Sequence, residues 1–66
     1  MKESRLFKII YYILENGRVT APELAEKFEV SVRTIYRDIG VISSAGMPIY
    51  VTTGRIGGIQ ILENYV

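Results

Sequence analysis

Apolar residues recur at helical spacing in the first part of the chain. The spacing i, i+3, i+4, i+7, i+8 predicts a core-facing helix and is formed by Leu6, Ile9, Ile10, Ile13 and Leu14. The Asn16-Gly17 pair ends it. Phe7 and Tyr11 widen the apolar stripe on one side, and we interpret them as further core residues, packed under whatever follows the third helix. A contact with another domain or subunit is the alternative.

A second, short helix is predicted over residues 20–28. Thr20 and Glu23 have the spacing of a capping box, in which each side chain bonds a backbone N–H of the first turn. Pro22 falls within that turn, where its missing N–H costs nothing. The inner face of this helix is apolar and consists of Ala21, Leu24, Ala25 and Phe28.

A third helix begins almost at once. Ser31 is a good N-cap, and Gly46 is well placed to end the helix in a left-handed conformation. The apolar stripe of this helix is formed by Val32, Ile35, Ile39 and Ile42. Because so short a connection prevents the two helices from lying flat against each other, we expect them to cross steeply, as in a helix-turn-helix.

The outer face of the third helix is small, cationic and able to form hydrogen bonds. Arg33 and Arg37 lie one turn apart, and Thr34 and Val41 share their sector. Such a face is typical of a helix that enters a DNA groove, although a solvated amphipathic helix with two incidental arginines has the same pattern. Tyr36 and Asp38 fall on the flanks. We interpret Asp38 as structural, paired with a basic group or capping a turn.

After Gly46 the apolar period changes from helical to alternating. Residues 49–53 and 59–62 are rich in β-branched residues and predict two strands. The segment between them, residues 54–58, carries Arg55 among glycines that can adopt positive φ. The prediction is therefore an α+β fold, a winged helix-turn-helix with three helices followed by a two-stranded β-hairpin wing, in a single domain over residues 1–66.

Composition narrows the function. The chain has no cysteine and no histidine, its acidic residues are scattered, and we see no catalytic constellation, so we expect neither an enzyme nor a metal or other cofactor. No signal peptide and no membrane-spanning stretch is visible, so we expect a cytoplasmic protein without membrane contact. The net charge is only +1, which predicts weak, salt-sensitive binding to nucleic acid per copy and favours a dimer as the working unit.

Four sequence pieces together resemble one known family. They are Val30-Ser31, residues 33–39 (RTIYRDI), residues 46–49 (GMPI) and Gly57-Gly58. In this order and spacing they are similar to the N-terminal DNA-binding domain of bacterial transcriptional regulators of the deoxyribonucleoside-repressor type, and closer still to the group that continues into a WYL sensor domain. The biotin-repressor N-terminus is a more distant relative. The resemblance runs from about Arg5 to Leu62.

The chain departs from this family at Gly40 and Val41, where such domains commonly carry a charged or polar residue. A glycine inside a helix costs about 1 kcal/mol relative to alanine. Either the backbone needs close approach to something at this point, or the helix is softer in its second half; we favour the second interpretation.

The resemblance implies sequence-specific binding of double-stranded DNA by a transcriptional regulator. Our hypothesis places the third helix in the major groove and the wing on the DNA backbone or in the minor groove. The residues expected to contact DNA are Thr20, Ala21, Ser31, Arg33, Thr34, Tyr36, Arg37 and Arg55. Thr20 and Ala21 would offer backbone N–H groups to a phosphate.

Similarity to the longer regulators also implies further partners. We expect a homodimer in the full-length protein, and an effector ligand bound by a C-terminal domain outside this chain. The alternative function is a winged helix that contacts only proteins, because fold alone does not decide between the two. RNA binding is a lesser alternative.

Overall fold

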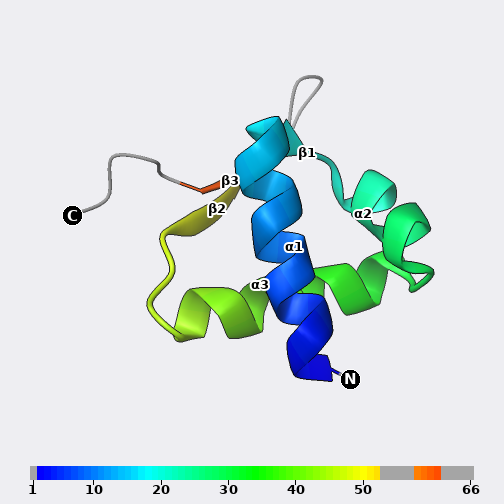
Figure 1. Ribbon diagram of the computed structural model, residues 1–66, viewed down its shortest axis with the longest axis horizontal. Helices are drawn as coiled ribbons and strands as arrows, with labels where there is room; N and C mark the ends of the chain where they lie inside the picture. Colours follow the sequence, from blue (N-terminus) through cyan, green and yellow to red (C-terminus); the bar gives the residue numbers. More distant parts are fainter. Residues whose placement is uncertain (1, 53–57, 62–66) are drawn as a thin grey trace.

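The computed structural model describes residues 2–52 and 58–61, with side chains from residue 5 onward. The described chain forms three helices and three short strands, and the last two strands follow the third helix (Figure 1). The elements are α1 (Lys2–Asn16), β1 (Arg18–Val19), α2 (Ala21–Phe28), α3 (Val32–Ser44), β2 (Ile49–Thr52) and β3 (Gly58–Ile61). The predicted α+β winged helix, with three helices before the wing strands, is confirmed.

The helix ends follow the predicted local chemistry. Thr20 caps α2, its Oγ1 accepting from the Glu23 N–H at 3.1 Å, while the Thr20 N–H donates to Glu23 Oε1 at 3.3 Å. Ser31 caps α3 by accepting from the Thr34 N–H at 3.1 Å. Gly17 and Gly46 follow α1 and α3 with φ of 82° and 101°, so both predicted glycine stops are confirmed.

The turn between α2 and α3 is tight. Glu29 adopts φ 57° and ψ 45°, a left-handed conformation that favours glycine. The Val30 N–H reaches back to the Ala25 carbonyl at 3.0 Å, which closes the end of α2 as in a Schellman motif. Val30 packs against the core. This turn sets the steep crossing of α2 and α3 that the short connection predicts.

The sheet has three antiparallel strands in the order β1-β3-β2. Arg18 pairs with Gln60 and Val19 with Ile59, while residues 49–52 of β2 pair with residues 61–58 of β3. The predicted two-stranded hairpin was therefore incomplete, because β1 adds a third strand. Thr53, Leu62 and most of the predicted tip, including Arg55, lie outside the described residues.

The sequence predicted that Gly58 is needed for positive φ in the wing loop, but the structure gives a different reason. It does not lie in the loop with positive φ; it begins β3, opposite Thr52. A Cβ at this position would lie 2.6 Å from Arg18 Cγ and 3.1 Å from the Val19 carbonyl oxygen. The neighbouring strand β1 therefore leaves no room for a side chain.

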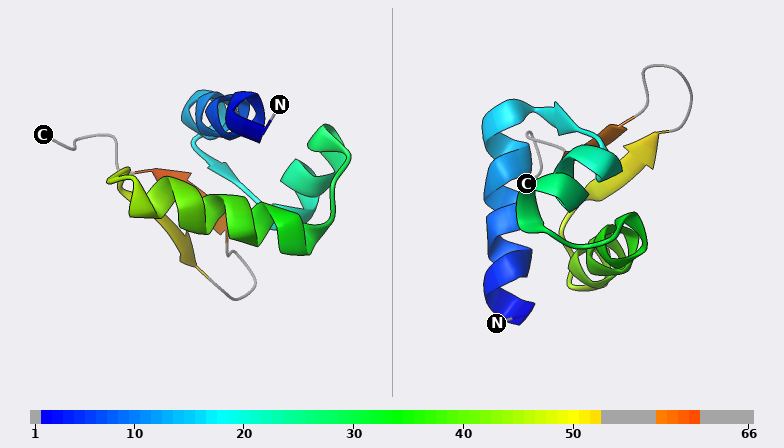
Figure 2. Two further views of the ribbon diagram at one scale, coloured as in Figure 1. Left: turned by 90° about the horizontal axis from the view of Figure 1, so that it is seen from below. Right: turned by 90° about the vertical axis from the view of Figure 1, so that its right-hand side faces the viewer.

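The core is apolar and draws on every element. Its buried members are Ile9, Ile13, Val19, Ala21, Leu24, Ala25, Ile35, Ile39, Ile42, Ile49, Ile59 and Ile61. The left view of Figure 2 shows α1 on one side of α3 and β2 on the other, while β3 passes behind α3 and contacts α1.

Some residues predicted to be in the core lie at the surface instead. Phe7 and Tyr11 are exposed, so their prediction as core residues was wrong, and Leu14 and Val32 are also partly exposed, at 43% and 38%. The inner faces of α1 and α3 are therefore narrower than the sequence pattern suggested.

Candidate nucleic-acid interface

The two arginines of α3 lie on its solvent side. Arg33 and Arg37 are exposed, and neither forms an ion pair with the residues that the structure describes. Like charges four residues apart destabilise a helix by about 0.2–0.5 kcal/mol. The fold gains nothing from these two charges in this arrangement. They are available to an external anion or to hydrogen-bond acceptors such as the edge of guanine.

A buried carboxylate of α3 pairs with a basic residue of α1. Asp38 is only 2% exposed, and it accepts hydrogen bonds from Arg5 of α1, at 2.7 Å from Nε to Oδ2 and 3.3 Å from Nη2 to Oδ1. The Asp38 carboxylate raises the pKa of Arg5 through this hydrogen bond. The expected pairing of Asp38 with a basic group is confirmed, and Arg5 is the partner that sequence reasoning did not name. This pair links α3 to α1.

Two hydroxyl groups meet at the start of α3. Ser31 Oγ accepts from the Thr34 N–H and donates to Thr34 Oγ1 at 3.0 Å. Thr34 Oγ1 is thus an acceptor toward Ser31, and its own hydrogen remains available as a donor. The half-buried hydroxyl group of Thr34 can therefore donate a hydrogen bond to an acceptor outside the protein, such as a phosphate oxygen.

The start of α2 offers fewer free donors than predicted. Of the first N–H groups, Thr20 donates to the Glu23 carboxylate, and Glu23 donates to Thr20. Pro22 has no N–H group. Ala21 is buried, and its N–H has no partner among the hydrogen bonds of the described chain. Of the two N–H groups predicted to bind a phosphate, only that of Ala21 lacks a partner among the described residues.

The flanks of α3 carry larger side chains. Tyr36 is half exposed, with its hydroxyl group free of hydrogen bonds to the described residues. Val41 is exposed on the other flank, where it lines an apolar groove with residues of α1. Tyr36 is therefore accessible beside Arg33 and Arg37, whereas Val41 belongs to a different surface.

The comparisons with known proteins agree with this architecture. The model of a family described as "HTH domain" matches residues 5–60. The chain belongs to this family. YobV, an uncharacterized HTH-type transcriptional regulator of Bacillus subtilis (strain 168), is 52% identical over 65 residues, covering 98% of this chain and 21% of the relative. The chain thus spans about one fifth of that relative's length. No solved structure matches it.

A further cation, Arg18, lies at the sheet and was not among the residues predicted to contact DNA. Arg18 of β1 is exposed, and its side-chain stem lies against Gly58 at the start of β3. A two-residue strand has no alternation that sequence could reveal. The only sequence signal was an arginine directly after the glycine that ends α1.

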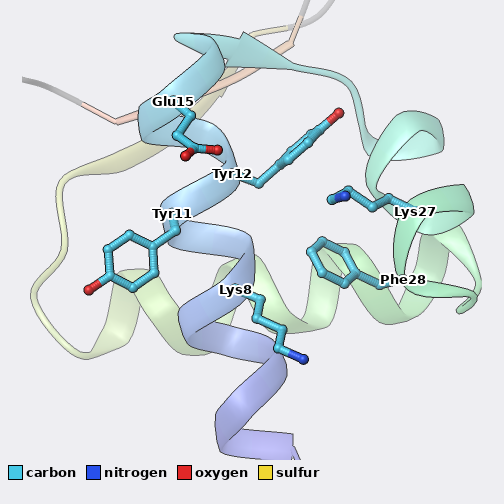
Figure 3. Close-up of a pocket in the computed structure, with 6 residues that line it drawn as sticks. All are labelled: Lys8, Tyr11, Tyr12, Glu15, Lys27 and Phe28. Carbon is cyan, nitrogen blue, oxygen red and sulfur yellow. The ribbon is translucent and has the colours of Figure 1, made fainter.

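A separate cleft of about 480 Å³ lies between α1 and α2 (Figure 3). Tyr12 and Phe28 form an edge-to-face pair with ring centroids 6.4 Å apart, and Lys27 Nζ lies 4.9 Å from the Tyr12 ring centroid. The Tyr12 hydroxyl donates to Glu23 Oε2 at 2.8 Å, which raises the pKa of Tyr12. These contacts hold α1 against the capping box of α2. We therefore interpret the side chains that line the cleft as packing contacts between the two helices.

A metal site and a membrane span each have requirements that the described residues do not meet. Within residues 2–52 and 58–61, no three His, Cys, Asp or Glu residues cluster as metal ligands would. None of the helices described is both long and apolar enough to cross a membrane. Membership of a helix-turn-helix family suggests a role other than catalysis.

Proposed function

We propose that this chain is the DNA-binding domain of a transcriptional regulator and that α3 reads DNA in the major groove. The observation that carries the proposal is the pair of exposed guanidinium groups, one turn apart, on the second helix of a helix-turn-helix. YobV, which carries a similar sequence, is by its name an HTH-type transcriptional regulator, and this supports the same role here. In this motif the second helix enters the groove with its N-terminal residues toward the bases.

Each residue of the α3 surface has a proposed role. Arg33 and Arg37 bond guanine edges or flanking phosphates, because a guanidinium group can donate two hydrogen bonds at once to guanine. Thr34 donates to a base edge or phosphate, with Ser31 holding its hydroxyl group in place. Tyr36 binds a phosphate through its hydroxyl group.

The start of α2 and the sheet supply backbone contacts. Ala21 offers its free N–H to a phosphate, whereas Thr20 supports this end of the helix through its cap. Arg55 reaches the DNA backbone or the minor groove, and Arg18 adds a second cation at the sheet. Contacts of this kind fix the register without reading sequence.

Two further proposals concern the longer regulator. Since YobV is about five times the length of this chain, we propose that an effector ligand is bound outside residues 1–66. We also propose that the regulator works as a homodimer.

The first test is the salt dependence of binding to random-sequence duplex DNA, followed by fluorescence anisotropy. With three phosphate contacts per copy, affinity should fall about 40-fold between 50 and 200 mM salt. Arg55→Ala should lower the slope of log affinity against log salt by about 0.9. Absence of binding to long duplex DNA at low salt would favour the protein-only alternative.

The second test separates base reading from positioning. Selection from a random duplex library should show that Arg33→Ala or Arg37→Ala relaxes the preference at one base pair and costs about 1–3 kcal/mol. Lys27→Ala removes the same charge from the α1–α2 cleft and is the matched control, with preferences unchanged. If both α3 variants kept the parental preferences, α3 would not be the reading helix.

A further inference from the structure

One face of α1 exposes large apolar side chains that the fold does not use. Phe7, Tyr11 and Leu14 are 63%, 68% and 43% exposed. Their spacing of four and then three residues places them on a single stripe of the helix. Scattered exposed hydrophobics need no explanation, but a contiguous stripe on a small domain marks an interaction surface.

An apolar groove extends this stripe. The groove has a volume of about 290 Å³ and lies between α1 and the C-terminal half of α3. Its lining residues include Phe7, Ile10 and Val41. No charged residue lines it. The stripe and the groove together form one continuous apolar face, which we call the α1 face.

We propose that the α1 face binds a second copy of this chain, with the two α1 helices antiparallel. Apolar residues separated alternately by four and three positions form the seam of a helix pair, in which each side chain packs between residues of the facing helix. Phe7, Tyr11 and Leu14 have this seam spacing, so the chemistry of the stripe fits another helix carrying the same stripe.

Charges beside the seam determine the partner and its direction. Lys8 follows Phe7 and Glu15 follows Leu14, so both lie on the same flank of the stripe, and Ile10 lies on the other. Within the residues whose side chains are described, neither Lys8 nor Glu15 forms an ion pair. Both are exposed. Figure 3 shows Tyr11 pointing away from α2 and Lys8 extending on the α2 side of the helix.

In an antiparallel pair of identical helices, the same flank of each helix meets. The Lys8 of one copy then lies beside the Glu15 of the other, and two-fold symmetry repeats the contact at the opposite end, with the axis near Tyr11. A parallel pair would instead bring Lys8 against the flank that carries Ile10. Charges beside a helix seam set partner and orientation, so the sequence of α1 favours a second copy, antiparallel.

This pairing leaves the proposed DNA surface free. α1 and β2 lie on opposite sides of α3 (Figure 2), and Arg33 and Arg37 belong neither to the stripe nor to the groove of the α1 face. The pairing does not depend on DNA binding and can be measured without DNA. Because only a few large side chains per copy take part, the area is below that of a typical stable dimer, and we expect dissociation in the micromolar to millimolar range.

Sedimentation equilibrium of the 66-residue chain between 10 µM and 1 mM tests the proposal. We expect a monomer–dimer equilibrium. Lys8→Glu and Glu15→Lys should each weaken it about tenfold, because either reversal turns two symmetry-related attractions into repulsions. The double variant should restore the parental association. Arg37→Glu reverses a charge on α3 outside the α1 face, and as a control it should leave association unchanged.

A seam variant completes the test. Phe7→Ser should abolish association while circular dichroism shows a folded domain, since Phe7 is exposed. A chain that remains monomeric at 1 mM would overturn the proposal. So would failure of the double reversal to restore association, or a Phe7→Ser variant that associates like the parent, because the copies would then meet through another face.

Discussion

The substitution Gly40→Ala tests two properties of α3 in separate assays: the stability of the helix and its contact with DNA. It lies in the middle of α3 on the exposed side, and a Cβ built on it meets nothing within 4 Å among the other described residues. Gly40→Ala therefore carries no steric cost in the folded domain. Alanine is favoured over glycine in a helix interior by about 0.8–1.0 kcal/mol, and we expect the free energy of unfolding to rise by that amount.

The gain is large for a domain of this size. Total stability of a 66-residue domain is about 3–10 kcal/mol, and 1 kcal/mol shifts the melting temperature by about 4–8 °C. Urea denaturation followed by circular dichroism measures it, with an unchanged slope showing that only stability moved. Gly46→Ala is the matched control: with φ at 101° it should lose about 1 kcal/mol, opposite in sign.

The DNA affinity of Gly40→Ala then decides between the two interpretations of this glycine. If Gly40 only softens the helix, affinity should stay at the parental value. A stabilised variant with lower affinity would mean that the α3 backbone must approach DNA closely there. A variant with unchanged or lower stability would refute the reasoning from propensity and open space.

Three further outcomes follow from the contacts. Asp38→Ala removes two hydrogen bonds to a buried carboxylate and should cost about 2 kcal/mol in urea denaturation; a loss within 0.5 kcal/mol would mean that the pair does not hold α3. Gly58→Val should destabilise by about 1–3 kcal/mol, because its Cβ meets Arg18 and the Val19 carbonyl, and parental stability would contradict that crowding. The pKa of Tyr12 is raised in the folded state, which means that the folded domain holds the hydroxyl proton more tightly than the unfolded chain. The contribution of this hydroxyl group to the free energy of unfolding is therefore complete below about pH 10 and is lost as pH rises through the folded pKa. The stability of Tyr12→Phe, compared with the parent between pH 8 and 11, should lack that decline, and identical profiles would argue against the bond to Glu23.

The helix ends were predictable because their chemistry is local. The Thr20–Glu23 capping box and the Ser31 cap join residues three apart in sequence, and Gly46 ends α3 through its own backbone conformation. The third helix and its outward arginines followed from the period of apolar residues within a dozen positions. Each of these features depends only on residues that are close together in the sequence.

The features that sequence missed depend on distant partners. β1 is a strand only because β3 lies beside it, and Gly58 is required only because Arg18 occupies the space above it. The pairing of Asp38 was expected, but its partner lies on another helix, 33 residues away. Phe7 and Tyr11 are exposed because nothing after α3 in the described chain covers that side of α1, and local pattern carries no such information.

The pairing of β1 with β3 also bears on how the domain is made on the ribosome. Arg18 emerges early, but its partner Gln60 is among the last residues of the described chain, and closing a loop of about forty residues has an entropic cost that the three helices must first reduce. The hydrogen-bonding edge of β1 therefore stays open until the sheet strands leave the exit tunnel. Premature termination within β2 would release a chain with its helices present and that edge unprotected, a species prone to pairing with other chains.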